Sequence, residues 1–229
     1  MEYKPVTHVL FDMDGLILNT EDLYTVAFQN IISQYGKDYT FELKLKLMGL
    51  QTNETANMVI SSLDLPITPE EFISQTTQEF QKLFPDTEVL PGARRLIEHL
   101  SKKNIPIGLA TSSSKESYEL KVNRHHKELF SLFPYKTMGS SDPDVKRGKP
   151  HPDIFLVAAS RFPDKPNPEM CLVFEDAVNG VKAARAAGMQ VVMVPDTRVD
   201  ASLTTEATLV IQSLEEFKPE LFGLPPFDD

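Results

Sequence analysis

VLFDMDGLILNT, residues 9–20, is the stretch that decides the fold of this chain. An apolar run, residues 6–11, leads into Asp12 and Asp14, and Gly15 follows them. If the run is a buried parallel strand, both carboxylates follow its carboxyl end, where open α/β sheets bind ligands. Residues two apart on a strand face the same side, so the carboxylates should point at one spot and repel each other without a cation. This spacing predicts a Mg²⁺ site; the alternative is a solvated turn, which the same residues favour.

The length and composition of the chain narrow its class. Its 229 residues suffice for one large domain or two modest ones, and 41% hydrophobic and 24% charged residues are ordinary for a globular protein. A net charge of −10 disfavours nucleic acid or an anionic membrane as the main partner. No apolar stretch is long enough to span a membrane, no signal peptide is recognisable, and Cys171 has no second cysteine to pair with. We expect a cytoplasmic monomer with no nucleic-acid or membrane partner.

The chain changes character twice. Residues 20–84 have helical periodicity and no convincing strand, whereas strands and helices alternate after them, which indicates a parallel sheet. We therefore expect an α/β fold with a Rossmann-like parallel sheet core, residues 1–16 and 89–229, and an inserted α-helical cap domain, residues 17–88. A last helix is expected near residues 214–221. The later strands are expected at residues 105–110, 135–138, 171–174, 190–194 and 208–211.

Polar residues that can do phosphate chemistry follow three of the expected strands. The carboxyl ends of neighbouring parallel strands meet at one edge of a sheet, so these residues should lie together. Carboxylates from two strand ends can hold a metal, and hydroxyl and N–H groups at a helix N-terminus can hold anionic oxygens. Lys149 adds a positive charge. This set suits phosphoryl transfer. In strand order, the residues are Asp12 and Asp14, Thr111 and Ser112, and Glu175 and Asp176.

With these four motifs in this order, the chain resembles the haloacid dehalogenase superfamily of phosphatases, with a helical cap inserted after the first motif. The resemblance implies that Asp12 is the catalytic nucleophile and Asp14 the general acid and base. It also implies that Thr111, with the backbone of Ser112, binds the transferring phosphoryl group. Lys149, in the sequence Gly-Lys-Pro, matches the third motif and binds the same group. A dehalogenase is disfavoured, because such sites resemble this one without its second aspartate and its metal.

The same resemblance implies a Mg²⁺ ion held by Asp12, Asp14 and Asp176, with Glu175 as a further ligand or a support. It implies an aspartyl-phosphate on Asp12, while Asp14 protonates the leaving oxygen and then activates water. The ordinary pKa of an aspartate is about 3.9. Cap closure and loss of water are therefore expected to matter for the protonation of Asp14.

Longer segments carry a closer resemblance to pseudouridine-5′-phosphatase-like proteins, among them residues 148–162 and 171–196. It implies a small phosphate ester, pseudouridine 5′-phosphate, as the substrate and a place in nucleotide metabolism. Glycerol-3-phosphatases and sugar-phosphate phosphatases resemble the same segments and stay open as alternatives. A phosphohexomutase is disfavoured, because such mutases resemble this chain but have a histidine in place of Tyr24 and an arginine near Thr52 and Asn53. The non-enzymatic alternative is a phosphate-binding protein without turnover.

Substrate specificity is expected to depend on the inserted helices. Glu21 and the turn at Met48, Gly49 and Leu50 are candidates for substrate binding, with Glu21 and Gly49 as the leading choices. Tyr24 is a further candidate for a specificity residue, although packing inside the cap explains Tyr24 and Met48 at least as well.

Overall fold

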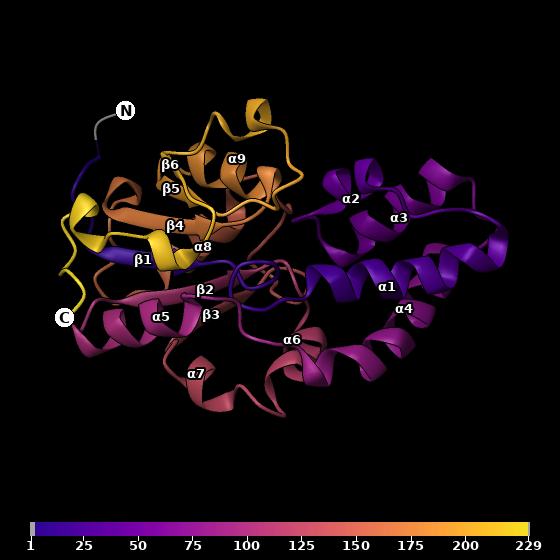
Figure 1. Ribbon diagram of the computed structural model, residues 1–229, viewed down its shortest axis with the longest axis horizontal. Coiled ribbons are helices and arrows are strands. Elements are labelled where there is room, and N and C mark those ends of the chain that lie inside the picture. The colour runs from indigo at the N-terminus through magenta and orange to yellow at the C-terminus, as the bar shows by residue number, and fades with distance from the viewer. Residues whose placement is uncertain (1–2, 229) are drawn as a thin grey trace.

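The computed structural model describes residues 3–228 and has a six-stranded sheet beside a lobe of helices (Figure 1). The sheet order is β3-β2-β1-β4-β5-β6, and every neighbouring pair is parallel. The first strand therefore lies in the middle, between β2 and β4. This arrangement confirms the predicted α/β class. The strands are β1 (His8–Phe11), β2 (Ile107–Thr111), β3 (Tyr135–Met138), β4 (Cys171–Glu175), β5 (Gln190–Met193) and β6 (Leu209–Val210).

The side chains of the sheet alternate between two hydrophobic layers. Val9 and Phe11 of β1 belong to one layer, and Leu10 belongs to the other. Helices cover both faces, which is why the central strands read as nearly continuous apolar runs. The helices are α5 (Ala93–Lys102), α6 (Lys115–Val122) and α7 (Lys127–Ser131) in the first layer, and α8 (Asp153–Ser160) and α9 (Val178–Ala186) in the second.

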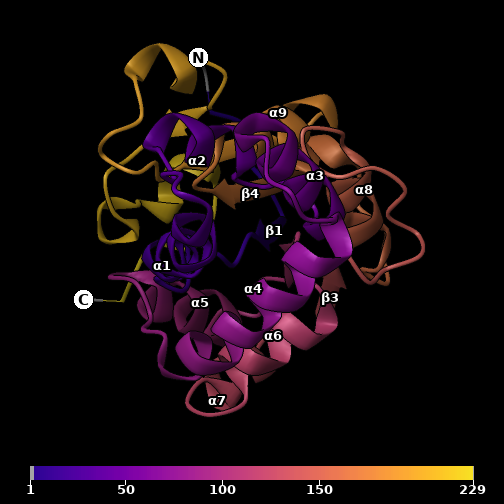
Figure 2. The same cartoon turned by 90° about the vertical axis from the view of Figure 1, so that its right-hand side faces the viewer.

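The helices between β1 and α5 form a lobe with its own hydrophobic cluster (Figure 2). Phe28 and Phe72 are buried in this cluster, which shares no buried residue with either layer around the sheet. We call this lobe the cap. Its separate cluster supports the division into a core of residues 1–16 and 89–229 and a cap of residues 17–88, which stays a prediction. The helices are α1 (Glu21–Ile32), α2 (Phe41–Leu47), α3 (Thr52–Leu63) and α4 (Pro69–Leu83).

The two connections between cap and core run side by side. Asn19 donates its backbone N–H to the carbonyl of Glu88 at 2.8 Å, and Leu90 donates to Ile17 at 2.8 Å. These bonds join the outgoing and the returning chain, so the cap is attached through one short paired segment. Such a paired segment can act as a hinge while the sheet stays fixed.

The C-terminal segment differs from the single helix predicted at residues 214–221. It forms two 3₁₀ turns, Leu214–Glu216 and Pro219–Phe222, with extended residues between them. Pro219 explains the difference, because it has no backbone N–H to donate along a helix and disfavours helical conformation in the residue before it. The second turn is nevertheless fixed, since Phe222 is fully buried in the first layer. None of the helices in the described part of the chain is long and apolar enough to cross a bilayer.

Candidate active site

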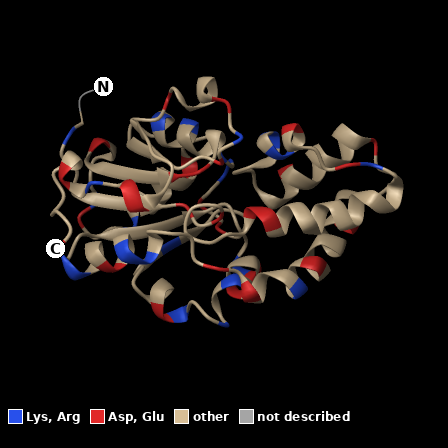
Figure 3. Ribbon diagram, viewed as in Figure 1, with Lys and Arg blue, Asp and Glu red and all other residues tan. Residues whose placement is uncertain are grey.

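The carboxyl ends of β1, β2 and β4 lie next to one another at the edge of the sheet that faces the cap (Figure 1). Phe11, the last residue of β1, pairs with Leu109 of β2 and with Phe174 of β4. The residues that follow these pairs therefore meet at one place. A cavity of about 470 Å³ lies between this edge and the cap. Figure 3 marks the positions of acidic residues in red along the ribbon, in the core as well as in the cap. The predicted residues lining the cavity are Asp12, Asp14, Glu21, Tyr24, Met48, Gly49, Leu50, Ser112, Glu175 and Asp176.

Three buried carboxylates form the floor of this cavity. Asp12, Glu175 and Asp176 each place a carboxylate oxygen within 4.8 Å of the others. Burial and the nearby charges of Glu175 and Asp14 raise the pKa of Asp12 to about 8, although Lys149 opposes them. Burial and neighbouring carboxylates also hold the pKa of Asp176 well above its usual value. Such a group of like charges is stabilised by a hard divalent cation, which prefers oxygen ligands.

Lys149 lies under the same cluster in the loop before α8. Its Nζ donates to Asp12 Oδ1 at 2.6 Å and to Glu175 Oε1 at 2.5 Å. Burial alone would lower the pKa of Lys149, but the two carboxylates outweigh it and raise that pKa. The lysine is therefore charged. Gly180 of α9 makes room for Glu175, since a Cβ at position 180 would lie 1.9 Å from the Glu175 carboxylate carbon.

The carboxylate of Asp14 has a different set of partners. Its Oδ1 accepts hydrogen bonds from Lys121 Nζ at 2.5 Å and from Thr20 Oγ1 at 2.7 Å, and its Oδ2 accepts one from Ser113 Oγ at 2.8 Å. Lys121 comes from α6 and is completely buried. Burial alone would raise the pKa of Asp14, but the charge and hydrogen bond of Lys121 and the two hydroxyls lower it. Asp14 is therefore ionised in this arrangement, whereas we expected cap closure to favour its protonated form.

We expected the side chains of Asp12 and Asp14 to point at one spot, whereas in the structure they bind different lysines. Asp12 binds Lys149, whereas Asp14 binds Lys121 and lies outside the group of three carboxylates. The strand ends one residue before Asp12, so the two-residue alternation of a strand no longer applies there. Gly15, with φ of 76°, then turns the chain back toward the cap connection.

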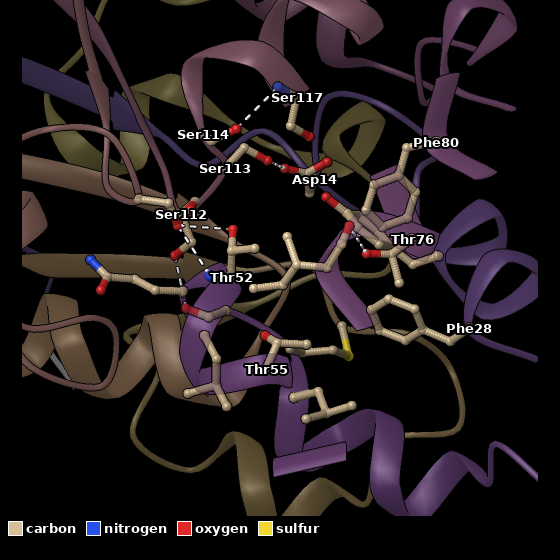
Figure 4. Close-up of a pocket in the computed structure, with 18 of the residues that line it drawn as sticks. Asp14, Phe28, Thr52, Thr55, Thr76, Phe80, Ser112, Ser113, Ser114 and Ser117 are labelled. Carbon is tan, nitrogen blue, oxygen red and sulfur yellow. Dashed lines mark hydrogen bonds between the residues drawn. The ribbon is translucent and has the colours of Figure 1, made fainter. Parts of the chain in front are cut away.

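The loop after β2 joins this site to the cap. The Thr111 hydroxyl donates to Asp14 Oδ2 at 3.3 Å and accepts the backbone N–H of Ser113 at 3.1 Å. Ser112 Oγ donates to the carbonyl of Gly49 at 2.8 Å. The structure thus places Thr111 of the second motif next to Asp14 of the first motif. It also connects Ser112 with the predicted cap turn at Gly49. Figure 4 shows this serine-rich loop at the wall of the cavity.

Two further cap residues reach the site. Glu21 pairs with Lys44 at 3.4 Å, and burial raises the pKa of Glu21 although Lys44 opposes it. Tyr24 packs against Phe80 with ring centroids 5.1 Å apart, and its hydroxyl accepts a hydrogen bond from Lys121 at 2.8 Å. Both explanations given for Tyr24 therefore apply, since it packs inside the cap and also contacts the active-site network.

Lys121, Thr20 and Ser113 are the partners of Asp14 that sequence reasoning missed. A signal for Lys121 exists: it lies three residues after Tyr118 and next to Val122, both of which pack into the first hydrophobic layer. A lysine on the apolar face of a helix usually has a buried acidic partner.

The comparisons with known proteins agree with this geometry. The family model described as haloacid dehalogenase-like hydrolase matches residues 9–194, which include all four motifs. The chain belongs to the haloacid dehalogenase-like hydrolases. The predicted family is confirmed.

Three similar proteins illustrate what this hydrolase resembles. A Drosophila melanogaster protein named "Probable pseudouridine-5'-phosphatase" is 53% identical over 99% of this chain and 97% of its own length. The Arabidopsis thaliana (DL)-glycerol-3-phosphatase 2 is 48% identical over 98% of this chain and 94% of its own length. The crystal structure of β-phosphoglucomutase from Clostridium difficile superposes with a TM-score of 0.77 at 24% identity, covering 94% of each chain, and shows the shared fold alone. This haloacid dehalogenase-like hydrolase is thus a phosphoric monoester hydrolase.

Proposed function

We propose that this phosphatase hydrolyses pseudouridine 5′-phosphate to pseudouridine and phosphate with Mg²⁺ at the acidic cluster. The main support is the near full-length identity of 53% to the Drosophila melanogaster protein. A glycerol-3-phosphatase is the second candidate, because the Arabidopsis thaliana relative is 48% identical. Action on a small-molecule ester, as a cytoplasmic monomer without nucleic-acid or membrane partners, is part of the same proposal.

The acidic cluster fits Mg²⁺ by the chemistry of its donors. Asp12, Glu175 and Asp176 offer three converging carboxylates, and Lys149 supplies only one positive charge against them. We infer that Asp12 and Asp176 ligate the ion and that Glu175 ligates it or orients Lys149. The ion would neutralise charge on the phosphoryl oxygens. The Asp14 side chain, expected among the ligands, is engaged by Lys121 instead.

In the first half of the proposed reaction, a carboxylate oxygen of Asp12 attacks phosphorus and the bond to the leaving alcohol breaks. Thr111, Ser112 and Lys149 would hold the phosphoryl oxygens, because they surround the end of β1 where Asp12 lies. The leaving oxygen takes a proton from Asp14. Asp14 must gain that proton first, and its ion pair with Lys121 opposes this step.

In the second half, water attacks the aspartyl-phosphate on Asp12. Asp14 accepts a proton from the water, phosphate leaves, and the Asp12 carboxylate is restored. The structure favours this half-reaction, because Lys121, Thr20 and Ser113 keep Asp14 ionised and able to act as a base. Asp14 thus ends the cycle with the proton that it donates in the next one.

The cavity favours a leaving group that is large and uncharged. Its volume of about 470 Å³ is in the range that accommodates drug-sized ligands, and glycerol is much smaller. None of the described residues that line it is Lys or Arg, so a second phosphate would find no cation there. This supports hydrolysis of a monoester over mutase chemistry through a bisphosphate. The acidic residues that line it are Asp12, Asp14, Glu21, Glu116, Glu175 and Asp176.

Phosphate release from a panel of esters at matched concentrations tests this proposal. The panel contains pseudouridine 5′-phosphate, uridine 5′-phosphate, glycerol 3-phosphate, 2-deoxyglucose 6-phosphate and β-glucose 1-phosphate, each with Mg²⁺ and with EDTA. We expect Mg²⁺-dependent release with a clear preference for pseudouridine 5′-phosphate over its N-glycosidic isomer. A profile that favours glycerol or sugar phosphates would refute the nucleotide assignment. Equal rates in EDTA would refute the metal assignment.

A further inference from the structure

Ser117 carries a polar atom that the protein leaves without a partner. Its Oγ is the one buried side-chain nitrogen or oxygen among residues 3–228 that makes no hydrogen bond. The residue lies in the first turn of α6, where its backbone N–H donates to Ser114 Oγ at 3.2 Å, and it lines the cavity (Figure 4). Burying a hydroxyl without a partner costs free energy, so such an atom in a ligand cavity calls for an explanation.

Three other hydroxyls around the cavity donate hydrogen bonds within the protein. Ser112 donates to the Gly49 carbonyl, and Ser113 donates to Asp14. The Thr76 hydroxyl donates to the Ile73 carbonyl at 2.9 Å. Ser117 thus differs from them, since its hydroxyl can still both donate and accept.

The position of Ser117 relates it to the leaving group and not to the phosphoryl group. Ser113, next to Thr111 at the phosphoryl site, contacts Asp14. Ser117 lies in the first turn of α6, beyond the loop of residues 112–114, and its hydroxyl makes no hydrogen bond to Asp14. A ligand atom at Ser117 therefore belongs to the part of the ester that leaves.

The charges around the cavity decide what kind of group Ser117 can meet. Glu116 precedes it and also lines the cavity, in which the described residues include no Lys or Arg. An anionic group would be repelled there, so the partner of the hydroxyl is uncharged. Apolar and aromatic side chains of the cap also line the cavity, Phe28 and Phe80 among them (Figure 4). A flat ring with a polar edge suits this lining.

We propose that Ser117 is a specificity-determining residue whose hydroxyl hydrogen-bonds an uncharged polar group, such as a nucleobase edge, on the leaving part of the substrate. This inference rests on the proposed function and adds to it a residue that distinguishes a nucleoside-sized leaving group from a small polyol. Glycerol has no ring that could lie along the aromatic side chains of the cavity.

The test compares Ser117→Ala with Ser117→Thr, which keeps the hydroxyl. Ser131→Ala is the matched control, because Ser131 is an exposed helical serine of α7. We expect KM for pseudouridine 5′-phosphate to rise about 2- to 12-fold in Ser117→Ala, the factor that one net neutral hydrogen bond implies. In the same variant, the inhibition constant of inorganic phosphate and kcat/KM for glycerol 3-phosphate stay at the wild-type values. Ser117→Thr and Ser131→Ala keep the wild-type KM.

An unchanged KM for pseudouridine 5′-phosphate in Ser117→Ala would overturn the proposal. So would a parallel rise in KM and in the phosphate inhibition constant, since that indicates a general distortion of the site. The substrate panel on the wild type separates the two proposals. If another ester is hydrolysed best, the proposed substrate is wrong, and the same comparison of Ser117→Ala with wild type on that ester decides the role of Ser117.

Discussion

Replacing Lys121 by methionine tests the buried ion pair that controls Asp14. The lysine is completely buried, its Nζ lies 2.5 Å from Asp14 Oδ1, and the Asp14 side chain is 15% exposed. Removing one partner of a buried pair costs about 3–5 kcal/mol, because the other charge is left uncompensated. Asp14 keeps its bonds from Thr20 and Ser113 and borders the cavity, so we expect the lower end, about 3 kcal/mol.

Urea unfolding and thermal melting measure this cost. About 3 kcal/mol corresponds to a decrease in Tm of about 6–12 °C for a chain of this size. Asp14→Asn in the Lys121→Met background removes the uncompensated charge, so the double variant should regain much of the lost stability. Lys102→Met is the control, since its partner Asp228 is at the surface, and its unfolding midpoint should stay close to wild type.

The same variant should also change catalysis. Without Lys121 the pKa of Asp14 rises, so the proton-donor step becomes easier and the activation of water becomes weaker. We expect the activity in the first half-reaction to extend to higher pH. A Lys121→Met protein with wild-type stability, wild-type pH profile and no coupling to Asp14→Asn would refute this account of the pair.

Three further predictions concern the cavity floor and the contact with the cap. Gly180→Ala should destabilise the fold by about 1–3 kcal/mol in urea unfolding and reduce turnover, because the new Cβ displaces the Glu175 carboxylate. In EDTA, the Tm should fall as pH rises from about 4 to about 8, because the folded protein binds the Asp12 proton more tightly than the unfolded chain does. Mg²⁺ should therefore raise the Tm more at about pH 9 than at about pH 6. Equal increases in Tm at the two pH values would contradict this. Asn179→Ala should raise KM about 2- to 12-fold with phosphate inhibition unchanged, because Asn179 donates to the Met48 carbonyl of the cap at 3.0 Å; an unchanged KM would exclude a role in holding the cap.

The meeting of three motifs at one edge could be predicted from sequence, because it depends only on strand order and direction. Asp12, Thr111 and Glu175 lie at or directly after apolar runs, and parallel neighbouring strands place such ends together. The helical character of the cap was equally accessible, since a 3.6-residue period identifies a helix without knowledge of its neighbours.

The direction of Asp14 and its pairing with Lys121 could not be predicted. The alternation of a strand gives directions only while the strand lasts, and β1 ends before Asp12. The lysine is 107 residues away from Asp14 in sequence, so their contact depends on how α6 packs against the cap connection. The free hydroxyl of Ser117 is also invisible in the sequence, because it follows from which of several nearby serines are already bonded.

Trapping of the covalent intermediate tests the central claim most directly. The substrate that the panel selects, labelled with radioactive phosphorus, is mixed with the enzyme and Mg²⁺ and quenched with acid during turnover. Wild-type protein should retain label that hydroxylamine releases, as expected for an acyl phosphate, and Asp12→Asn should retain none and release no phosphate. Phosphate release by Asp12→Asn at a rate close to wild type would contradict the assignment of Asp12 as the nucleophile.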